Sequence, residues 1–160
     1  MKSSSNKKGN QDTPGNATSN VLPVVGIGAS AGGLEALEMF LSHVSPHTGF
    51  AFIVVTHQLP GHISLLPDLL TKFTDMPVLT AEDGMFLKRD YVFVCPPGKN
   101  LALLNRRLHL MESQKYDSSN LPIDYFLRSL AEDVQEMGIG IILSGTGTDG
   151  TLGLKTIKGV

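Results

Sequence analysis

The sequence predicts an α/β domain in which a doubly wound, mainly parallel sheet is flanked by helices, with a small antiparallel hairpin. Short apolar runs without polar alternation indicate strands buried on both faces, as in parallel sheets. Stretches between them place apolar residues three and four positions apart, which is the spacing of amphipathic helices. The order strand, glycine-rich turn, helix occurs near both ends of residues 21–160. This repetition favours a Rossmann-like three-layer arrangement with right-handed crossovers.

The first half of this domain is predicted to contain two strands and two helices. Residues 21–27 are rich in valine and end in glycines, which predicts the first strand. Leucines recur on one face of residues 34–44 until a proline stops the pattern, which predicts a helix. Residues 50–56, FAFIVVT, predict a second buried strand, and residues 66–73 predict a second amphipathic helix.

The second half is predicted to begin with short strands and to end with a strand and a helix. Turn residues separate four strand pieces, of which the last two are expected to pair as a hairpin: 77–80, 91–95, 101–104 and 108–111. After a polar loop over 113–120, apolar residues from Ile123 to Met137 recur with a clear helical period. Residues 140–144 predict another buried strand, and a final helix is expected to begin near Thr151.

Charge and composition exclude several classes of function. The net charge of −2 includes no cluster of Lys or Arg that would attract nucleic acid. Residues 1–20 hold too few apolar side chains to join a core, so we expect a disordered polar tail. Because no signal peptide and no run of about 20 apolar residues is present, we expect a cytoplasmic protein without membrane insertion. Cys95 is the only cysteine. His43 and His47 are four positions apart, but Ser45-Pro46 interrupts the helix that would align them for a metal, so we expect no metal site.

The stretch VVGIGASAGGL, residues 24–34, fits two templates. Its glycines match the G-x-G-x-x-A pattern of a dinucleotide-binding turn. Such a site usually needs an acidic residue about 20 positions further on, and no Asp or Glu occurs between Glu38 and Asp68. The same stretch also matches the G-x-S-x-G turn that exposes a nucleophilic serine, here Ser30. The sequence therefore favours a serine turn and predicts no cofactor, with dinucleotide binding as the weaker alternative.

A nucleophilic serine needs a base and a third group that orients this base. His57 and Asp149 each follow a predicted strand, so we expect both at the same sheet edge as Ser30. Each also has an ordinary interpretation, since a histidine can be a satisfied polar group and Asp149 could cap the last helix. Unpaired amides at the start of the first helix are expected to bind an oxyanion, with three candidates: Ala31, Gly32 and Gly33.

Five blocks of sequence follow one another in an order that is typical of one enzyme family: GIGASAGG, VVTHQLPGH, AEDGM, LPIDYFLRSLAED and ILSGTGTDGT. With these blocks the chain resembles, from about Val21 to Val160, the catalytic domain of the CheB-type protein-glutamate methylesterases of chemotaxis. Parts of the blocks are most similar to the version that is fused to a CheR-type methyltransferase. Because the family's domain continues further, the domain over residues 21–160 is expected to be incomplete at its C-terminus.

The resemblance implies a function and a set of catalytic residues. It implies a serine hydrolase that removes methyl groups from glutamate methyl esters of methyl-accepting chemoreceptors, sometimes also deamidating receptor glutamines. Ser30 would be the nucleophile, His57 the general base and Asp149 the orienting carboxylate, and no cofactor is needed.

Two residues depart from the family pattern and leave a second hypothesis open. Ala31 stands where many members have threonine, and Thr146 stands where many have methionine. Thr146 and Gly147 are expected to line the site, so the changes could alter substrate fit. The alternative is therefore a weak or inactive module that binds receptors or regulates a fused or associated methyltransferase.

Overall fold

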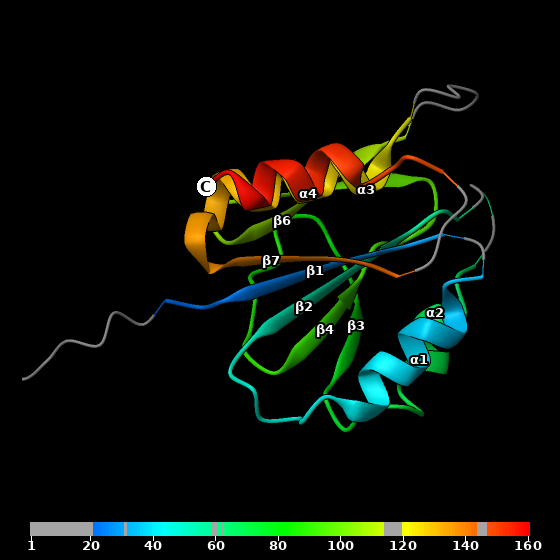
Figure 1. Ribbon diagram of the computed structural model, residues 1–160. Coiled ribbons are helices and arrows are strands. Elements are labelled where there is room, and N and C mark those ends of the chain that lie inside the picture. Colours follow the sequence, from blue (N-terminus) through cyan, green and yellow to red (C-terminus); the bar gives the residue numbers. More distant parts are fainter. Residues whose placement is uncertain (1–20, 31, 59–60, 62, 114–119, 144–146) are drawn as a thin grey trace, which may run out of the picture.

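The computed structural model describes the following residues: 21–30, 32–58, 61, 63–113, 120–143 and 147–160. The predicted polar tail over 1–20 and most of the predicted loop over 113–120 lie outside the described residues. The described part forms three layers, with a five-stranded sheet between two layers of helices (Figure 1). This architecture confirms the predicted α/β fold.

The central sheet is parallel throughout and has the strand order β3-β4-β2-β1-β7. Its strands are β1 (Val24–Ala29), β2 (Ala51–Thr56), β3 (Val78–Thr80), β4 (Tyr91–Val94) and β7 (Gly138–Leu143). The chain first adds strands on one side of β1 and later adds β7 on the other side, so the strand order reverses at β1. Ligands of such sheets bind beyond the carboxyl ends of the strands at this reversal.

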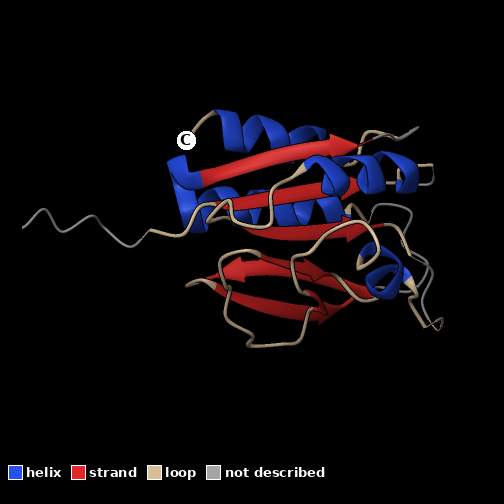
Figure 2. Cartoon of the chain, turned by 90° about the horizontal axis from the view of Figure 1, so that it is seen from below, coloured by secondary structure: helices blue, strands red, loops and turns tan. Residues whose placement is uncertain are grey.

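Helices cover both faces of the sheet, as a doubly wound fold requires (Figure 1 and Figure 2). One face carries α1 (Leu34–His43) and α2 (Leu66–Leu70). The other face carries α3 (Pro122–Val134), which continues into the short helix η1 (Gln135–Met137), and α4 (Thr151–Lys158).

The predicted hairpin forms a second, two-stranded sheet on the α3 side of the molecule. It consists of β5 (Lys99–Leu104) and β6 (Arg107–Glu112), which pair antiparallel. The buried leucines of the hairpin share one apolar core with Phe126 and Leu130 of α3. The hairpin therefore helps to hold α3 in place on the sheet.

Two apolar cores lie on opposite faces of the sheet, because successive residues of a strand point to opposite sides. Val25 and Val54 pack in the core under α1 and α2, while Val24 and Ile53 pack in the core under α3. All four side chains are buried. This double coverage explains why β1 and β2 read as continuous apolar runs rather than as alternating ones.

The strands that carry the site are shifted from their predicted bounds. β1 begins at Val24 rather than at residue 21 and runs to Ala29, because all six of its residues pair with both β2 and β7. Only glycine fits at position 28 of this strand, because α3 approaches closely there. A Cβ on Gly28 would lie 2.4 Å from Cγ2 of Ile123.

The second predicted helix ends at Leu70 rather than at residue 73, since the following turns form hydrogen bonds that span three residues.

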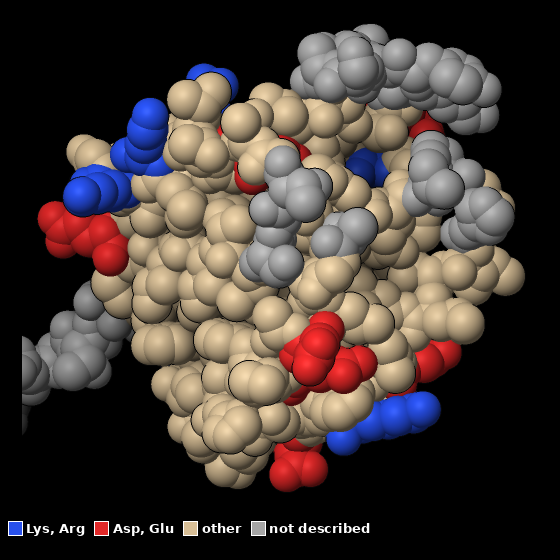
Figure 3. Space-filling model, turned by 45° about the vertical axis from the view of Figure 1, so that its right-hand side comes forward, with Lys and Arg blue, Asp and Glu red and all other residues tan. Residues whose placement is uncertain are grey.

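The surface around the carboxyl ends of the strands is largely uncharged. Figure 3 shows this side with a group of acidic side chains near its middle and Lys and Arg side chains in small separate groups.

Among the described residues, no helix is long and apolar enough to cross a bilayer. Within the same part of the chain, no three His, Cys, Asp or Glu side chains gather as metal ligands would.

Candidate active site

Ser30 and His57 are brought together by the register of two neighbouring strands. Ala29, the last residue of β1, pairs with Thr56, the last residue of β2. Ser30 and His57 follow directly, so both leave the sheet at its carboxyl edge, from strands that lie about 4.8 Å apart. The sequence prediction that these two residues share an edge is therefore confirmed.

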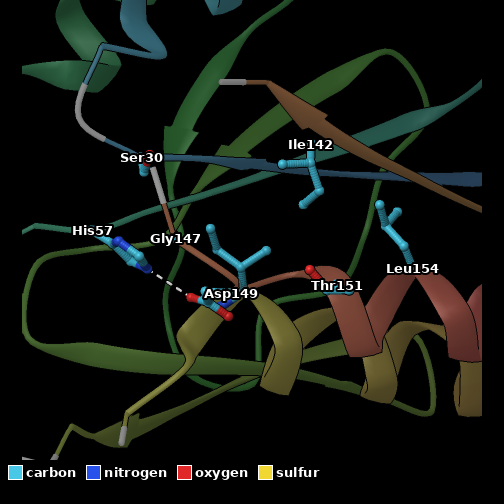
Figure 4. Close-up of a pocket in the computed structure, with 8 residues that line it drawn as sticks. Ser30, His57, Ile142, Gly147, Asp149, Thr151 and Leu154 are labelled. Atoms are coloured by element: carbon cyan, nitrogen blue, oxygen red, sulfur yellow. Dashed lines mark hydrogen bonds and ion pairs between the residues drawn. The ribbon is translucent and has the colours of Figure 1, made fainter. Parts of the chain in front are cut away.

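Asp149 reaches the same edge from the segment between β7 and α4. Its Oδ2 lies 2.7 Å from Nε2 of His57 (Figure 4). The side chain of Asp149 is 5% exposed and that of His57 is 43% exposed, so the carboxylate is shielded from water while the ring stays accessible. Because a carboxylate only accepts hydrogen bonds, Nε2 of His57 is the donor in this contact.

The first turn of α3 fixes the Asp149 carboxylate. The amide of Ile123 donates to Oδ2 at 3.1 Å, and the amide of Asp124 donates to Oδ1 at 2.7 Å. Pro122 occupies the first helical position and has no N–H, so these are the first two amides that the helix can offer. The helix dipole favours a negative charge at this place.

Asp149 thus caps a helix, although not the one that the sequence suggested. The ordinary interpretation expected its side chain to cap α4, which follows it in the chain. Instead, Gly150 is the N-cap residue of α4 and has a φ of 94°, and no side chain caps that helix locally. The Asp149 carboxylate points back to α3, where it can bind His57 at the same time.

A pocket of about 190 Å³ holds the three candidate catalytic residues (Figure 4). Ser30, His57 and Asp149 line it together with Gly147, which confirms their predicted proximity. The rest of the lining is mostly apolar: Ile123, Ile142, Thr151 and Leu154. Apolar walls lower the local polarity, which strengthens the hydrogen bonds that the polar groups make.

A second and larger pocket of about 410 Å³ lies on the other side of the same serine. Ser30 and His57 line both pockets, so these two candidate catalytic side chains stand between them. The larger pocket also exposes apolar side chains, namely Leu34, Ile63 and Leu65. A long substrate can therefore contact the protein beyond the atoms that react.

The turn after Ser30 differs in one respect from the prediction. The amide of Gly33, one of the three candidate oxyanion donors, donates to the carbonyl oxygen of Ser30 at 2.8 Å and is therefore not unpaired. Gly33 is needed for close packing instead, since a Cβ there would lie 2.7 Å from the carbonyl oxygen of Leu143. Gly32 has a φ of 90° and lines the larger pocket. Ala31 and Thr146 lie outside the described residues.

Sequence reasoning missed the part that the start of α3 plays in the site. The segment Leu121-Pro122-Ile123-Asp124 begins a long helix without Ser, Thr, Asn or Asp at the N-cap. A proline at the first position with no capping side chain before it indicates that an acceptor comes from elsewhere in the fold. That signal could have pointed to Asp149, although not to the distance between them.

Comparison with known proteins relates the chain to one family. A family model described as CheB methylesterase matches residues 25–160. The protein-glutamate methylesterase/protein-glutamine glutaminase of Bacillus subtilis (strain 168) is 30% identical over 136 residues, which cover 82% of this chain and 38% of that protein. The protein of the same name from Thermotoga maritima is 30% identical over 139 residues, which cover 84% of this chain and 40% of that protein.

A solved structure and a longer relative extend this comparison. The crystal structure of the Thermotoga maritima CheB methylesterase catalytic domain matches with a TM-score of 0.76 and 30% identity, over 86% of this chain and 75% of that one. An uncharacterised 104.1 kDa protein of Rhodobacter capsulatus is 40% identical over 92 residues, which are 58% of this chain and 10% of that protein. The chain thus spans about two fifths of the length of the two curated methylesterases.

Proposed function

Because the chain belongs to the CheB methylesterase family, we propose that it is a protein-glutamate methylesterase of a chemotaxis-type signalling system. Its proposed substrates are the glutamate methyl esters of methyl-accepting chemoreceptors, and the names of its relatives favour glutamine side chains as further substrates. One observation carries the proposal. His57 and Asp149 form a 2.7 Å hydrogen bond in the pocket that Ser30 lines.

In the proposed acylation step, Ser30 Oγ attacks the ester carbonyl while Nδ1 of His57 takes the hydroxyl proton. Nδ1 is the available ring nitrogen because Nε2 faces Asp149. The tetrahedral intermediate then expels methanol, which receives the proton from His57, and Ser30 keeps the glutamyl group as an ester. Asp149 stabilises the positively charged ring between these two proton transfers.

In the proposed deacylation step, water takes the place of methanol and the same proton transfers occur in reverse. His57 takes a proton from the water molecule as its oxygen attacks the acyl carbonyl. Collapse of the second tetrahedral intermediate returns the proton to Ser30 and releases the glutamate side chain. A glutamine substrate follows the same course, with ammonia leaving in place of methanol.

We assign the oxyanion to the turn at the start of α1. The amide of Gly33 is already used within this turn, so Gly32 is the remaining candidate donor among the described residues. Support for Gly32 comes from its position in the lining of the larger pocket, next to Ser30. Amides fixed in a turn stabilise the negative charge of the intermediate without having to reorganise during the reaction.

The exposed apolar residues of the larger pocket favour a protein substrate. Ile63 is 91% exposed, Leu65 is 71% exposed and Leu34 is 42% exposed, and all three line the pocket beside Ser30 and His57. Large apolar side chains that remain in contact with water near a reactive group are typical of surfaces that bind a partner. A receptor segment could bury them while its methyl ester enters the site.

We also propose that the domain acts beside a receptor methyltransferase, either fused or associated. The support is the resemblance of its motifs to the fused version and the match to a short part of the 104.1 kDa relative. Co-purification of the full natural protein, followed by an assay of methyl transfer to receptors, tests this. Recovery of the esterase without any methyltransferase activity would contradict it.

The experiment that tests the proposed function uses receptor membranes that carry tritium-labelled methyl esters. We expect the protein to release volatile labelled methanol, and to release ammonia from receptors that have glutamine at the same positions. The ratio of the two rates gives the preference for ester or amide. Receptor binding without release of either product would support the alternative of a non-catalytic module.

A further inference from the structure

The N-terminus of α3 and that of α4 are each bound by a carboxylate from the segment of the other helix. Asp149, which lies just before α4, accepts hydrogen bonds from two amides of the first turn of α3. Asp124, which lies in that first turn of α3, accepts a hydrogen bond at 2.7 Å from the amide of Gly153 in α4. Each helix start is thus bound by an acidic side chain from the segment of the other helix.

Neither helix has a capping side chain of its own. The N-cap residues are Leu121 for α3 and Gly150 for α4, and neither provides a side-chain hydrogen bond. The first amides of a helix need an acceptor when they are buried. The bond between Asp124 and Gly153 therefore ties the start of α4, just after Asp149, to the first turn of α3.

The carboxylate of Asp124 is buried, and only one of its two oxygens has a hydrogen-bond partner among the described residues. The residue is 5% exposed, and its Oδ2 is buried without a hydrogen-bond partner among the described residues. A buried polar atom without a partner costs free energy. A side chain that lowers stability in this way indicates a role in the site rather than in the fold alone.

The close approach of the two helices makes this bond possible. Gly153 packs directly against Leu127 of α3, and a Cβ on Gly153 would lie 2.5 Å from Cβ of Leu127 and 3.3 Å from the carbonyl oxygen of Asp124. A larger residue would force the helix starts apart. The amide of Gly153 would then move away from Asp124, and the segment of Asp149 would move with α4.

We propose that Asp124 is a positioning residue of the hydrolytic site, which acts by clamping α4 to α3 and so holding Asp149 Oδ2 against His57. The inference rests on the proposed function, because it gives the contact between His57 and Asp149 a catalytic purpose. Asp124 would contribute to the site without touching either the substrate or the reacting atoms. A displacement of about 1 Å at a catalytic group can cost about 10²-fold in rate.

The test compares three variants with a matched control. Asp124→Ala removes the clamp, Gly153→Ala displaces α4 without removing a carboxylate, and Asp124→Asn keeps an oxygen acceptor for the Gly153 amide. The control is Asp133→Ala, because Asp133 lies near the other end of α3, is similarly buried and accepts two backbone amides of the hairpin turn, those of Asn105 and Arg106. The folded fraction of each protein is measured by circular dichroism.

Two measurements are made on each protein. The first is the NMR signal of the His57 ring proton that is shared with Asp149. The second is the rate at which a fluorophosphonate labels Ser30, taken over a range of concentrations so that the maximal rate and the half-saturating concentration are separated.

We expect Asp124→Ala and Gly153→Ala to lose the shared-proton signal and to lower the maximal labelling rate about 10²-fold per folded molecule. The half-saturating concentration should stay the same, Asp124→Asn should recover most of the rate, and Asp133→Ala should behave as the unmodified protein does. An unchanged signal in both Asp124→Ala and Gly153→Ala, or an equal loss in Asp133→Ala, would overturn the inference. If the unmodified protein is not labelled at all, the proposed function fails, and the NMR signal still decides whether Asp124 positions Asp149.

Discussion

Asp149 Oδ2 lies 2.7 Å from Nε2 of His57, although 92 residues separate the two in the sequence. The sheet brings His57 to the carboxyl edge at the end of β2, and the start of α3 holds the carboxylate opposite the ring. Asp149 itself lies in the segment between β7 and α4, so the contact depends on three parts of the chain that meet only when it is folded.

Replacing the Asp149 carboxylate should reduce hydrolysis much more than it reduces stability. Asp149→Asn removes the charge that stabilises the protonated ring and favours the wrong tautomer of His57, and we expect kcat to fall by about 10⁴-fold. The free energy of unfolding should fall by about 1 kcal/mol, because the cap of α3 is weakened. Methanol release and urea unfolding measure the two effects. Asp68→Asn, an exposed carboxylate of α2, is the control, and an equal loss of activity in both variants would refute the role of Asp149.

Gly28 should tolerate no side chain. A Cβ there would lie 2.4 Å from Cγ2 of Ile123 and 2.8 Å from Cδ1 of Ile142, so Gly28→Ala must push α3 or β7 away from β1. We expect a loss of about 1–3 kcal/mol in the free energy of unfolding. Thermal and urea unfolding check this against Gly159→Ala, where the nearest atoms lie at an ordinary 3.5 Å. If the two variants were equally stable, α3 could not pack as closely against Gly28 as these distances indicate.

The thiol of Cys95 should be unreactive in the folded protein. Burial raises the pKa of Cys95 from its usual 9.0 to about 12, so almost no thiolate is present at neutral pH. Iodoacetamide should therefore label the protein only after unfolding, as mass spectrometry can show. Because the unfolded thiol loses its proton at a lower pH, this group's contribution to stability is complete below pH 9 and is lost as the pH rises toward 12. Rapid labelling of the native protein at pH 7 would show that the residue is not buried.

The apolar residues beside the larger pocket should matter for receptors more than for small esters. Ile63→Ser and Leu65→Ser remove exposed apolar side chains that we expect a receptor segment to cover. KM for methylated receptor should rise several-fold, and by more than KM for a small activated ester. Met39→Ser is a suitable control, because Met39 is also exposed but does not line this pocket. If Met39→Ser raises the receptor KM as much as Leu65→Ser does, the pocket is not the binding surface.

Much of the fold could be predicted because its signals are local. The apolar runs of β1 and β2 and the helical period of α3 reflect burial of each segment by itself, and the structure confirms all three elements. The bounds of the elements were predicted less accurately, since β1 extends through Gly28 to Ala29 by pairing with β2 and with β7, a strand more than 100 residues later in the chain. Pairing partners of that kind leave no mark in a single stretch of sequence.

The site was predictable to a smaller extent. Ser30 and His57 each follow the end of a predicted strand, and this was enough to predict that they lie at one edge of the sheet. Parallel strands place their carboxyl ends together. Of the three candidate oxyanion amides, that of Gly33 is not unpaired, since it donates to the carbonyl oxygen of Ser30 within the turn. The uncapped start of α3 was a signal in the sequence, but it did not identify the acceptor. The contact between Asp124 and α4 could not be foreseen, because it depends on how two helices pack and not on either helix alone.

The most direct test of the central claim is methanol release from methylated receptors by the unmodified protein and by Ser30→Ala. The matched control is Ser42→Ala, which changes a serine on α1 whose hydroxyl bonds to a backbone carbonyl of its own helix. If Ser30 is the nucleophile, its loss should lower kcat by about 10⁶-fold, since the residues of such a site act as a unit, while Ser42→Ala keeps full activity. Methanol release that Ser30→Ala leaves unchanged would contradict the account.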